Sequence, residues 1–181
     1  DILLPTLADH YFKHEDYIDS YNTYMDWANR GFFKAKKWLD FANSLRKEES
    51  YLLSIDAYQF ALKQDLKGYQ FGEALLGLAK AFEDQIYPIE KNDIIPFFYG
   101  DNIFFEDAFQ VYSKISPNNL QSSLNIYDSI LVSIPESSLV TEAQYRLAEI
   151  QYRIIEDFDK AFTLYMTAFN QNPPTKLKKK I

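Results

Sequence analysis

Residues 38–61 read WLDFANSLRKEESYLLSIDAYQFA, and they give the clearest indication of the fold. Trp38, Phe41 and Leu45 recur at helical spacing, so a helix would place them on one face. After a short polar turn, Ser54 and Tyr58 mark the face of a second helix in the same way. The stretch therefore predicts two helices joined by a turn.

The pattern is an internal repeat, because residues 4–27 show it 34 positions earlier. Small residues recur at the same offset where the two helices approach, as Ala8 and Ala42 and as Ser20 and Ser54. Further copies are carried by Leu75, Leu78, Ala79 and Phe82, and by Leu147, Ala148 and Tyr152 followed by Ala161, Tyr165, Ala168 and Pro173. The last copy has one extra residue in its turn.

These offsets resemble the tetratricopeptide repeat, a 34-residue unit with small and large apolar residues at fixed places. The resemblance is carried most clearly by Trp38, Phe41 and Ala42 followed by Ser54 and Tyr58. It implies an all-α, right-handed α-solenoid of antiparallel helix pairs, in which only neighbouring pairs cover each other's apolar faces. Residues 123–135 and 142–152 are similar to bacterial periplasmic members such as the BamD-type outer-membrane assembly lipoproteins.

We predict one solenoid domain over residues 1–173 and a basic C-terminal tail over 174–181. The repeats are expected near 1–34, 35–68, 69–102, 103–136 and 137–173, with the third degenerate. Helices are expected near 2–14, 17–29, 32–47, 50–65, 69–85, 103–115, 119–133, 139–155 and 158–171, with an irregular insert at 86–102 and no strands.

The register is ambiguous in the middle of the chain, where Pro88 and Pro96 would break an ordinary second helix. Residues 105–115 fit either the delayed second helix of the third repeat or the first helix of the fourth. The latter is preferred, because residues 120–134 then supply a second helix that ends at Pro135.

Composition bounds the class of protein. An apolar fraction of 47% with 17% aromatic residues supports a packed core. The net charge of −7 opposes the phosphate contacts that nucleic-acid binding requires. The apolar runs are too short for a transmembrane helix. With no cysteine, the compartment stays open between a bacterial periplasm or envelope and the cytoplasm.

The sequence offers little for catalysis, and we expect no enzyme, metal or cofactor. His10 and His14 share a helix face, but no third ligand accompanies them, so they are interpreted as surface or capping residues. The adjacent carboxylates are interpreted as solvated helix ends; they are Glu48 with Glu49, Glu83 with Asp84, and Glu156 with Asp157. The many rings recur at packing offsets and are interpreted as core.

In the tetratricopeptide family the first helix of each pair lines a concave groove, and the resemblance places a set of residues there. They are Asp9, Phe12, Lys13, Leu39, Asn43, Arg46, Lys47, Leu76, Lys80, Glu83, Tyr145, Glu149, Tyr152 and Arg153. Asn43, Arg46 and Lys47 resemble the set with which some members hold a peptide's terminal carboxylate, or they form a solvated polar face.

The resemblance implies a non-catalytic scaffold or adaptor that binds a peptide or helix of a protein partner in this groove. Two alternatives remain open. The chain could be a recruiting or regulatory segment of a larger enzyme. It could also be a module that self-associates end to end through its N-terminal edge at residues 2–4.

Overall fold

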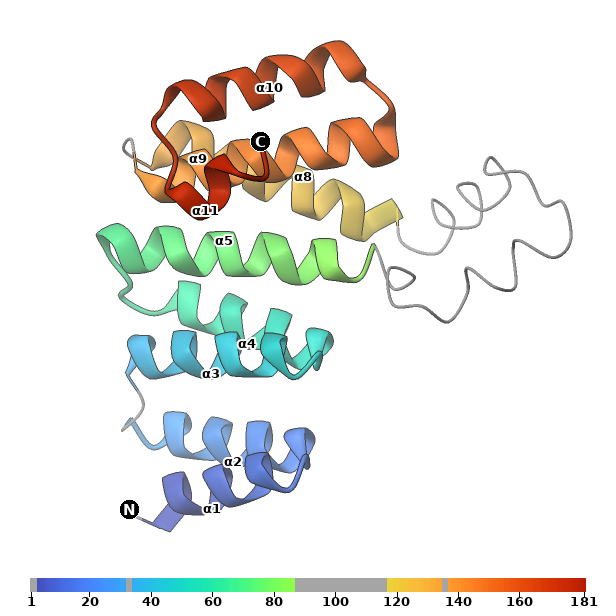
Figure 1. Ribbon diagram of the computed structural model, residues 1–181. Helices are drawn as coiled ribbons and strands as arrows, with labels where there is room; N and C mark the ends of the chain where they lie inside the picture. Colours follow the sequence, from blue (N-terminus) through green and yellow to red (C-terminus); the bar gives the residue numbers. More distant parts are fainter. Residues whose placement is uncertain (1–2, 32–33, 87–116, 135–136) are drawn as a thin grey trace, which may run out of the picture. The chain divides into compact units, whose positions relative to one another are not determined.

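The computed structural model describes residues 3–31, 34–86, 117–134 and 137–181. Within these ranges the chain forms consecutive paired helices and no strand, which confirms the all-α, solenoid-like prediction (Figure 1). The helices are α1 (Leu3–Lys13), α2 (Tyr17–Asn29), α3 (Ala35–Lys47), α4 (Tyr51–Lys63), α5 (Gly68–Asp84), α8 (Pro117–Ser133), α9 (Ser138–Ile150), α10 (Phe158–Asn170) and α11 (Thr175–Lys178), with a π-helical turn η1 (Gln151–Ile155) after α9.

The predicted helices outside the middle of the chain match these bounds to within a few residues. The short helix α11 lies in the predicted basic tail and was not expected. The predicted helix at 103–115 and nearly all of the insert at 86–102 lie outside the described residues. The described chain groups into two compact units, Asp1–Ala81 and Phe82–Ile181, and their boundary falls within α5.

In the first unit the repeat appears as a pair of equivalent hydrogen bonds. The Ser20 hydroxyl donates to the carbonyl oxygen of Ala8 at 2.9 Å, and the Ser54 hydroxyl donates to that of Ala42 at 3.1 Å. All four residues are buried, so each serine brings a second helix close to an alanine of the first helix. The 34-residue offset in the sequence is therefore an offset in structure as well.

The turns within the helix pairs repeat too. Glu15 and Glu49 have φ angles of 64° and 63°, in the left-handed region. The next residue closes the turn in each case, since Asp16 N–H donates to the carbonyl of Tyr11 at 3.0 Å and Ser50 N–H to that of Leu45 at 2.9 Å. This is the Schellman arrangement that ends many helices, with glutamate where glycine is usual.

Aromatic rings fill the space between α2 and α3. Trp38 is fully buried and Phe41 nearly so. The Tyr21 ring centroid lies 5.8 Å from that of Trp38, and the Tyr24 centroid lies 4.4 Å from that of Phe41. The apolar face predicted for residues 38–45 is therefore the core of this unit, because it receives the rings of the preceding helix.

In the second unit, the pair α9 and α10 accommodates the extra residue predicted in the last turn. The chain forms the π-helical turn η1, and the closing bond runs from Asp157 N–H to the carbonyl of Gln151 at 3.0 Å, one residue further than in the first unit. Glu156 is again left-handed, at φ 61°. A π turn absorbs one inserted residue without breaking the helix.

A buried polar cluster joins α5, α8 and α9. Glu83 is only 2% exposed; its carboxylate accepts a 2.5 Å hydrogen bond from the Tyr127 hydroxyl and lies 3.3 Å from Nε of Arg146. Burial is the largest single influence on Arg146 and would lower its pKa, but Glu83, Tyr127 and Asp84 together outweigh burial and raise the pKa. The interpretation of Glu83 as a solvated helix end is therefore wrong, because its charge is matched inside the unit.

Candidate functional site

The predicted groove residues fall into two groups by burial. The side chains of Leu39, Leu76 and Tyr145 are buried, as is Glu83, so the chain itself covers them. The remaining ten are exposed or half-buried and belong to first helices or to η1. They are Asp9, Phe12, Lys13, Asn43, Arg46, Lys47, Lys80, Glu149, Tyr152 and Arg153. The predicted set thus mixes core and surface positions.

Three of these ten exposed or half-buried residues are hydrogen-bonded to tyrosines of the second helices. Tyr24 donates to the Asp9 carboxylate, and Tyr165 donates to the Glu149 carboxylate. Tyr58 donates to the side-chain oxygen of Asn43 at 2.5 Å. Burial first, and then the acidic partner, raise the pKa of Tyr24 and of Tyr165, so both hydroxyls remain protonated donors at neutral pH. This repeated contact pins each second helix to its first helix.

The amide of Asn43 is also engaged on its other side, where its nitrogen lies 3.4 Å from the Glu73 carboxylate of α5. A carboxylate of the chain is therefore already near the group that was predicted to hold a peptide's terminal carboxylate. Of the other two members of that set, Arg46 is half-buried and Lys47 is exposed. The contacts of Asn43 favour a structural role for it.

In the last repeat, Tyr152 and Arg153 lie on η1. Nε of Arg153 is 2.9 Å from the Glu149 carboxylate, and the Tyr152 ring packs edge-to-face on Phe158 with centroids 5.6 Å apart. The equivalent ring pair in the first repeat joins Phe12 to Tyr17 at 5.2 Å. These ring pairs brace the turns.

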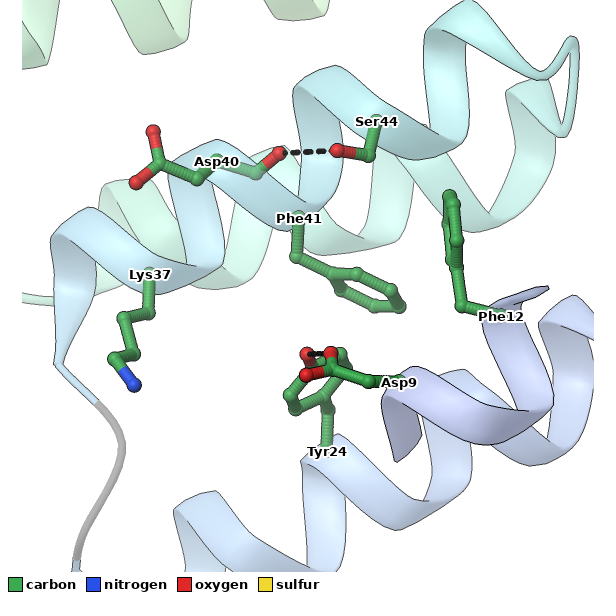
Figure 2. A pocket seen from close by; sticks show the side chains of 7 residues that line it. All are labelled: Asp9, Phe12, Tyr24, Lys37, Asp40, Phe41 and Ser44. Carbon is green, nitrogen blue, oxygen red and sulfur yellow. Dashed lines mark hydrogen bonds between the residues drawn. The ribbon is translucent and has the colours of Figure 1, made fainter. Parts of the chain in front are cut away.

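The first unit contains an open pocket of about 220 Å³ between the α1–α2 pair and α3. Its lining consists of Asp9, Phe12, Tyr24, Lys37, Asp40, Phe41 and Ser44. Figure 2 shows the rings of Phe41 and Phe12 in the space between the helices, with the Asp9 carboxylate facing the Tyr24 hydroxyl. The centroids of Phe12 and Phe41 are 6.0 Å apart, so two rings form its apolar part.

The charged groups that line this pocket are two carboxylates, those of Asp9 and Asp40, and the ammonium group of Lys37. Asp9 and Asp40 are both exposed, and Asp40 lies 2.6 Å from Nζ of Lys36 on its own helix. Such an exposed pair is weak and can exchange for another cation. Nζ of Lys37, the one cationic lining residue, lies 5.0 Å from the centre of the Trp27 ring.

Sequence reasoning found Asp9 and Phe12 but missed five lining residues. Tyr24 and Phe41 are among the rings that the sequence predicts as core, and most of their surface does lie there. Lys37, Asp40 and Ser44 are exposed positions of α3, on the side of the helix opposite to Leu39. The available signal was their spacing of three to four residues, which places them on one helix face.

No metal centre is formed by the described residues, among which no group of three or more acidic, histidine or cysteine side chains converges. His10 and His14 are exposed neighbours with ring centroids 4.4 Å apart. In the same parts of the chain, no helix is long and apolar enough to cross a membrane.

No protein-family model matches this sequence, and no curated protein is significantly similar to it. The tetratricopeptide resemblance is therefore carried by the repeated residues of the chain alone, and it stays a prediction.

Proposed function

We propose that this chain is a tetratricopeptide-type, non-catalytic scaffold that binds a peptide segment of a protein partner on the face formed by α1 and α3. The observation that carries the proposal is the open pocket between these helices, which combines apolar rings with polar groups at its rim. Binding pockets generally combine an apolar lining with a few polar groups that orient the ligand.

The lining indicates which side chain the pocket accepts. Phe12 offers ring surface to an aliphatic stem beside the nearly buried ring of Phe41, and the two carboxylates of Asp9 and Asp40 outnumber the single cation of Lys37. Lysine and arginine have this form, since an apolar stem carries a cationic end. A cation near aromatic faces and carboxylates gains from both. The ligand is therefore a peptide with a basic residue beside apolar ones.

A peptide-display selection tests this function, with the native chain as target and a Ser44→Trp variant for counter-selection. Ser44 is exposed and its hydroxyl donates only within α3, to the carbonyl of Asp40 at 3.0 Å, so an indole can fill the pocket with little cost to folding. The matched control is Ser129→Trp, an exposed serine of α8 that also bonds within its helix.

Peptides with Lys or Arg beside apolar residues should be enriched on the native chain and on the Ser129→Trp control, and lost on Ser44→Trp. The variants Asp40→Lys and Asp128→Lys make the same change of charge. Asp40→Lys should lose the enriched peptides and Asp128→Lys should retain them, because only Asp40 borders the pocket. Failure to enrich any peptide, or equal binding to Ser44→Trp, would overturn the proposal.

A further inference from the structure

Helix α10 exposes a stripe of large apolar side chains along one face. Phe158, Phe162, Met166 and Phe169 follow one another at intervals of three or four residues, which places them on the same side of a helix. Phe158 is 58% and Phe162 is 67% exposed. The adjoining face carries Ala161 and Ala168, which are buried. The buried side of α10 thus continues into an exposed apolar stripe, and at its last residue, Phe169, Nζ of Lys178 in α11 lies 5.1 Å from the ring centre.

The internal repeat identifies what this stripe corresponds to in the first unit. Tyr165 of α10 makes the hydrogen bond that Tyr24 makes in α2, and counting back three residues from each aligns Phe162 with Tyr21. The Tyr21 ring packs on the first helix of the next pair, with its centroid 5.8 Å from that of Trp38. In α4 the corresponding residue is Ile55, which is buried. Phe162 therefore holds a position that elsewhere in the chain contacts a following first helix.

Helix α1 presents the complementary half of this contact. The 34-residue offset places Leu4 and Leu7 at the positions of Trp38 and Phe41. Phe41 is 6% exposed because rings of the preceding pair cover it, whereas Leu7 is 42% exposed. One molecule thus carries both a second-helix face and a first-helix face of the type that pack together between Tyr21 and Trp38.

We propose that the apolar face of α10 binds α1 of a second copy of this chain, head to tail, with Phe162 of one copy against Leu4 and Leu7 of the other. The contact is heterologous, so each molecule keeps one free half after pairing. Each copy carries a net charge of −7, and the copies repel each other at low ionic strength. The association should therefore strengthen with salt. It is independent of the peptide pocket.

Sedimentation velocity of the full chain over a range of concentrations and salt tests the contact. The native chain should show a mass that rises with concentration. Phe162→Asp and Leu7→Asp should each weaken association by more than about tenfold, since a carboxylate would be buried without a partner. Leu52→Asp is the control, because Leu52 is a 72% exposed leucine of α4 outside the contact; it should associate like the native chain.

Mixing the two variants gives the decisive result. Phe162→Asp retains an intact α1 and Leu7→Asp retains an intact α10, so an equimolar mixture should form one-to-one dimers that neither variant forms alone. Far-UV circular dichroism confirms that both are folded. The proposal is overturned by a native chain that stays monomeric, by a mixture that stays monomeric, or by loss of association in Phe162→Asp but not in Leu7→Asp, which would place two α10 helices together instead.

Discussion

Tyr24, Tyr58 and Tyr165 show how one residue position specifies the pairing of two helices. Each hydroxyl donates to an Asp, Asn or Glu oxygen just after the small residue at which the helices touch. The acceptor differs among the copies, but an oxygen is always present. In a shifted helix pair the hydroxyl would lose its hydrogen bonds to water without gaining an acceptor. This bond therefore favours one register of the two helices.

Tyr58, the tyrosine at this position in α4, leaves room only for a glycine at position 77 of α5. A Cβ added to Gly77 would lie 2.4 Å from Cζ of Tyr58, whose ring is fully buried and held by Asn43. Gly77→Ala should therefore lower the free energy of unfolding by about 1–3 kcal/mol. Both tryptophans of the chain, Trp27 and Trp38, lie in the first unit, so denaturant unfolding followed by tryptophan fluorescence measures this change. Unchanged or increased stability would show that the ring has room to move.

Glu49, in the turn between α3 and α4, has a strained backbone conformation. Its φ of 63° lies in the left-handed region, which costs an L-residue about 1 kcal/mol. Glu49→Gly should raise the free energy of unfolding by about 0.5 kcal/mol in the same fluorescence assay, after the added freedom of the unfolded chain is offset. Glu48 has a φ of −85°, so Glu48→Gly should lower it. The reverse order would contradict the assigned turn.

At the scale of elements, the second unit depends on the contact of Glu83 in α5 with Tyr127 in α8 and Arg146 in α9. Arg146→Met should destabilise the unit by about 3–5 kcal/mol at neutral pH, because Glu83 would be left as an uncompensated buried charge. Without the arginine, burial would raise the pKa of Glu83 above its unfolded value. At low pH Glu83 of the variant is protonated and its burial costs little. As the pH rises through the pKa of Glu83 in the folded variant, the side chain becomes charged and the variant loses stability.

The destabilisation of Arg146→Met should therefore be smaller near pH 4 than near pH 7. Denaturant titrations followed by far-UV circular dichroism at the two pH values measure the difference. In the double variant Glu83→Gln, Arg146→Met the carboxylate is absent, so the difference in destabilisation between the two pH values should vanish. A loss of stability in Arg146→Met that is equal at both pH values would show that the arginine acts by packing alone.

The helices themselves were largely predictable, because the apolar spacing and the 34-residue offset are local signals. The extra residue of the last turn could be counted in the sequence, although its π-helical form could not. Glu83 was misjudged because its partner Tyr127 lies far along the chain. The pocket was only partly predicted, because Phe41 and Tyr24 line it while packing most of their rings in the core.

At the scale of the whole molecule, buried and half-buried tyrosines make the stability of both units depend on pH. Burial and acidic neighbours raise the pKa of Tyr24 in the first unit and of Tyr127 and Tyr165 in the second. The stabilisation from these raised pKa values is fully present below about pH 10, the pKa of tyrosine in the unfolded chain. It falls as the pH rises further, because only the unfolded chain then releases these protons. Tyrosinate absorbance and circular dichroism should change together in alkali.

Tyr165→Phe provides the control for this titration. The variant has one fewer group with a raised pKa, so its stability should fall less steeply with pH than that of the native chain. Tyrosinate formation well before any loss of helix would contradict the burial of these hydroxyls.

Peptide binding at the pocket between α1 and α3 would distinguish a scaffold from a chain whose aromatic rings serve only the core. The most direct measurement is calorimetric titration of one display-selected basic and apolar peptide into the native chain, Ser44→Trp and Ser129→Trp. We expect one-to-one binding to the native chain and to Ser129→Trp, weakened by more than about tenfold in Ser44→Trp. Equal affinity for all three proteins would place the peptide elsewhere and contradict the proposed site.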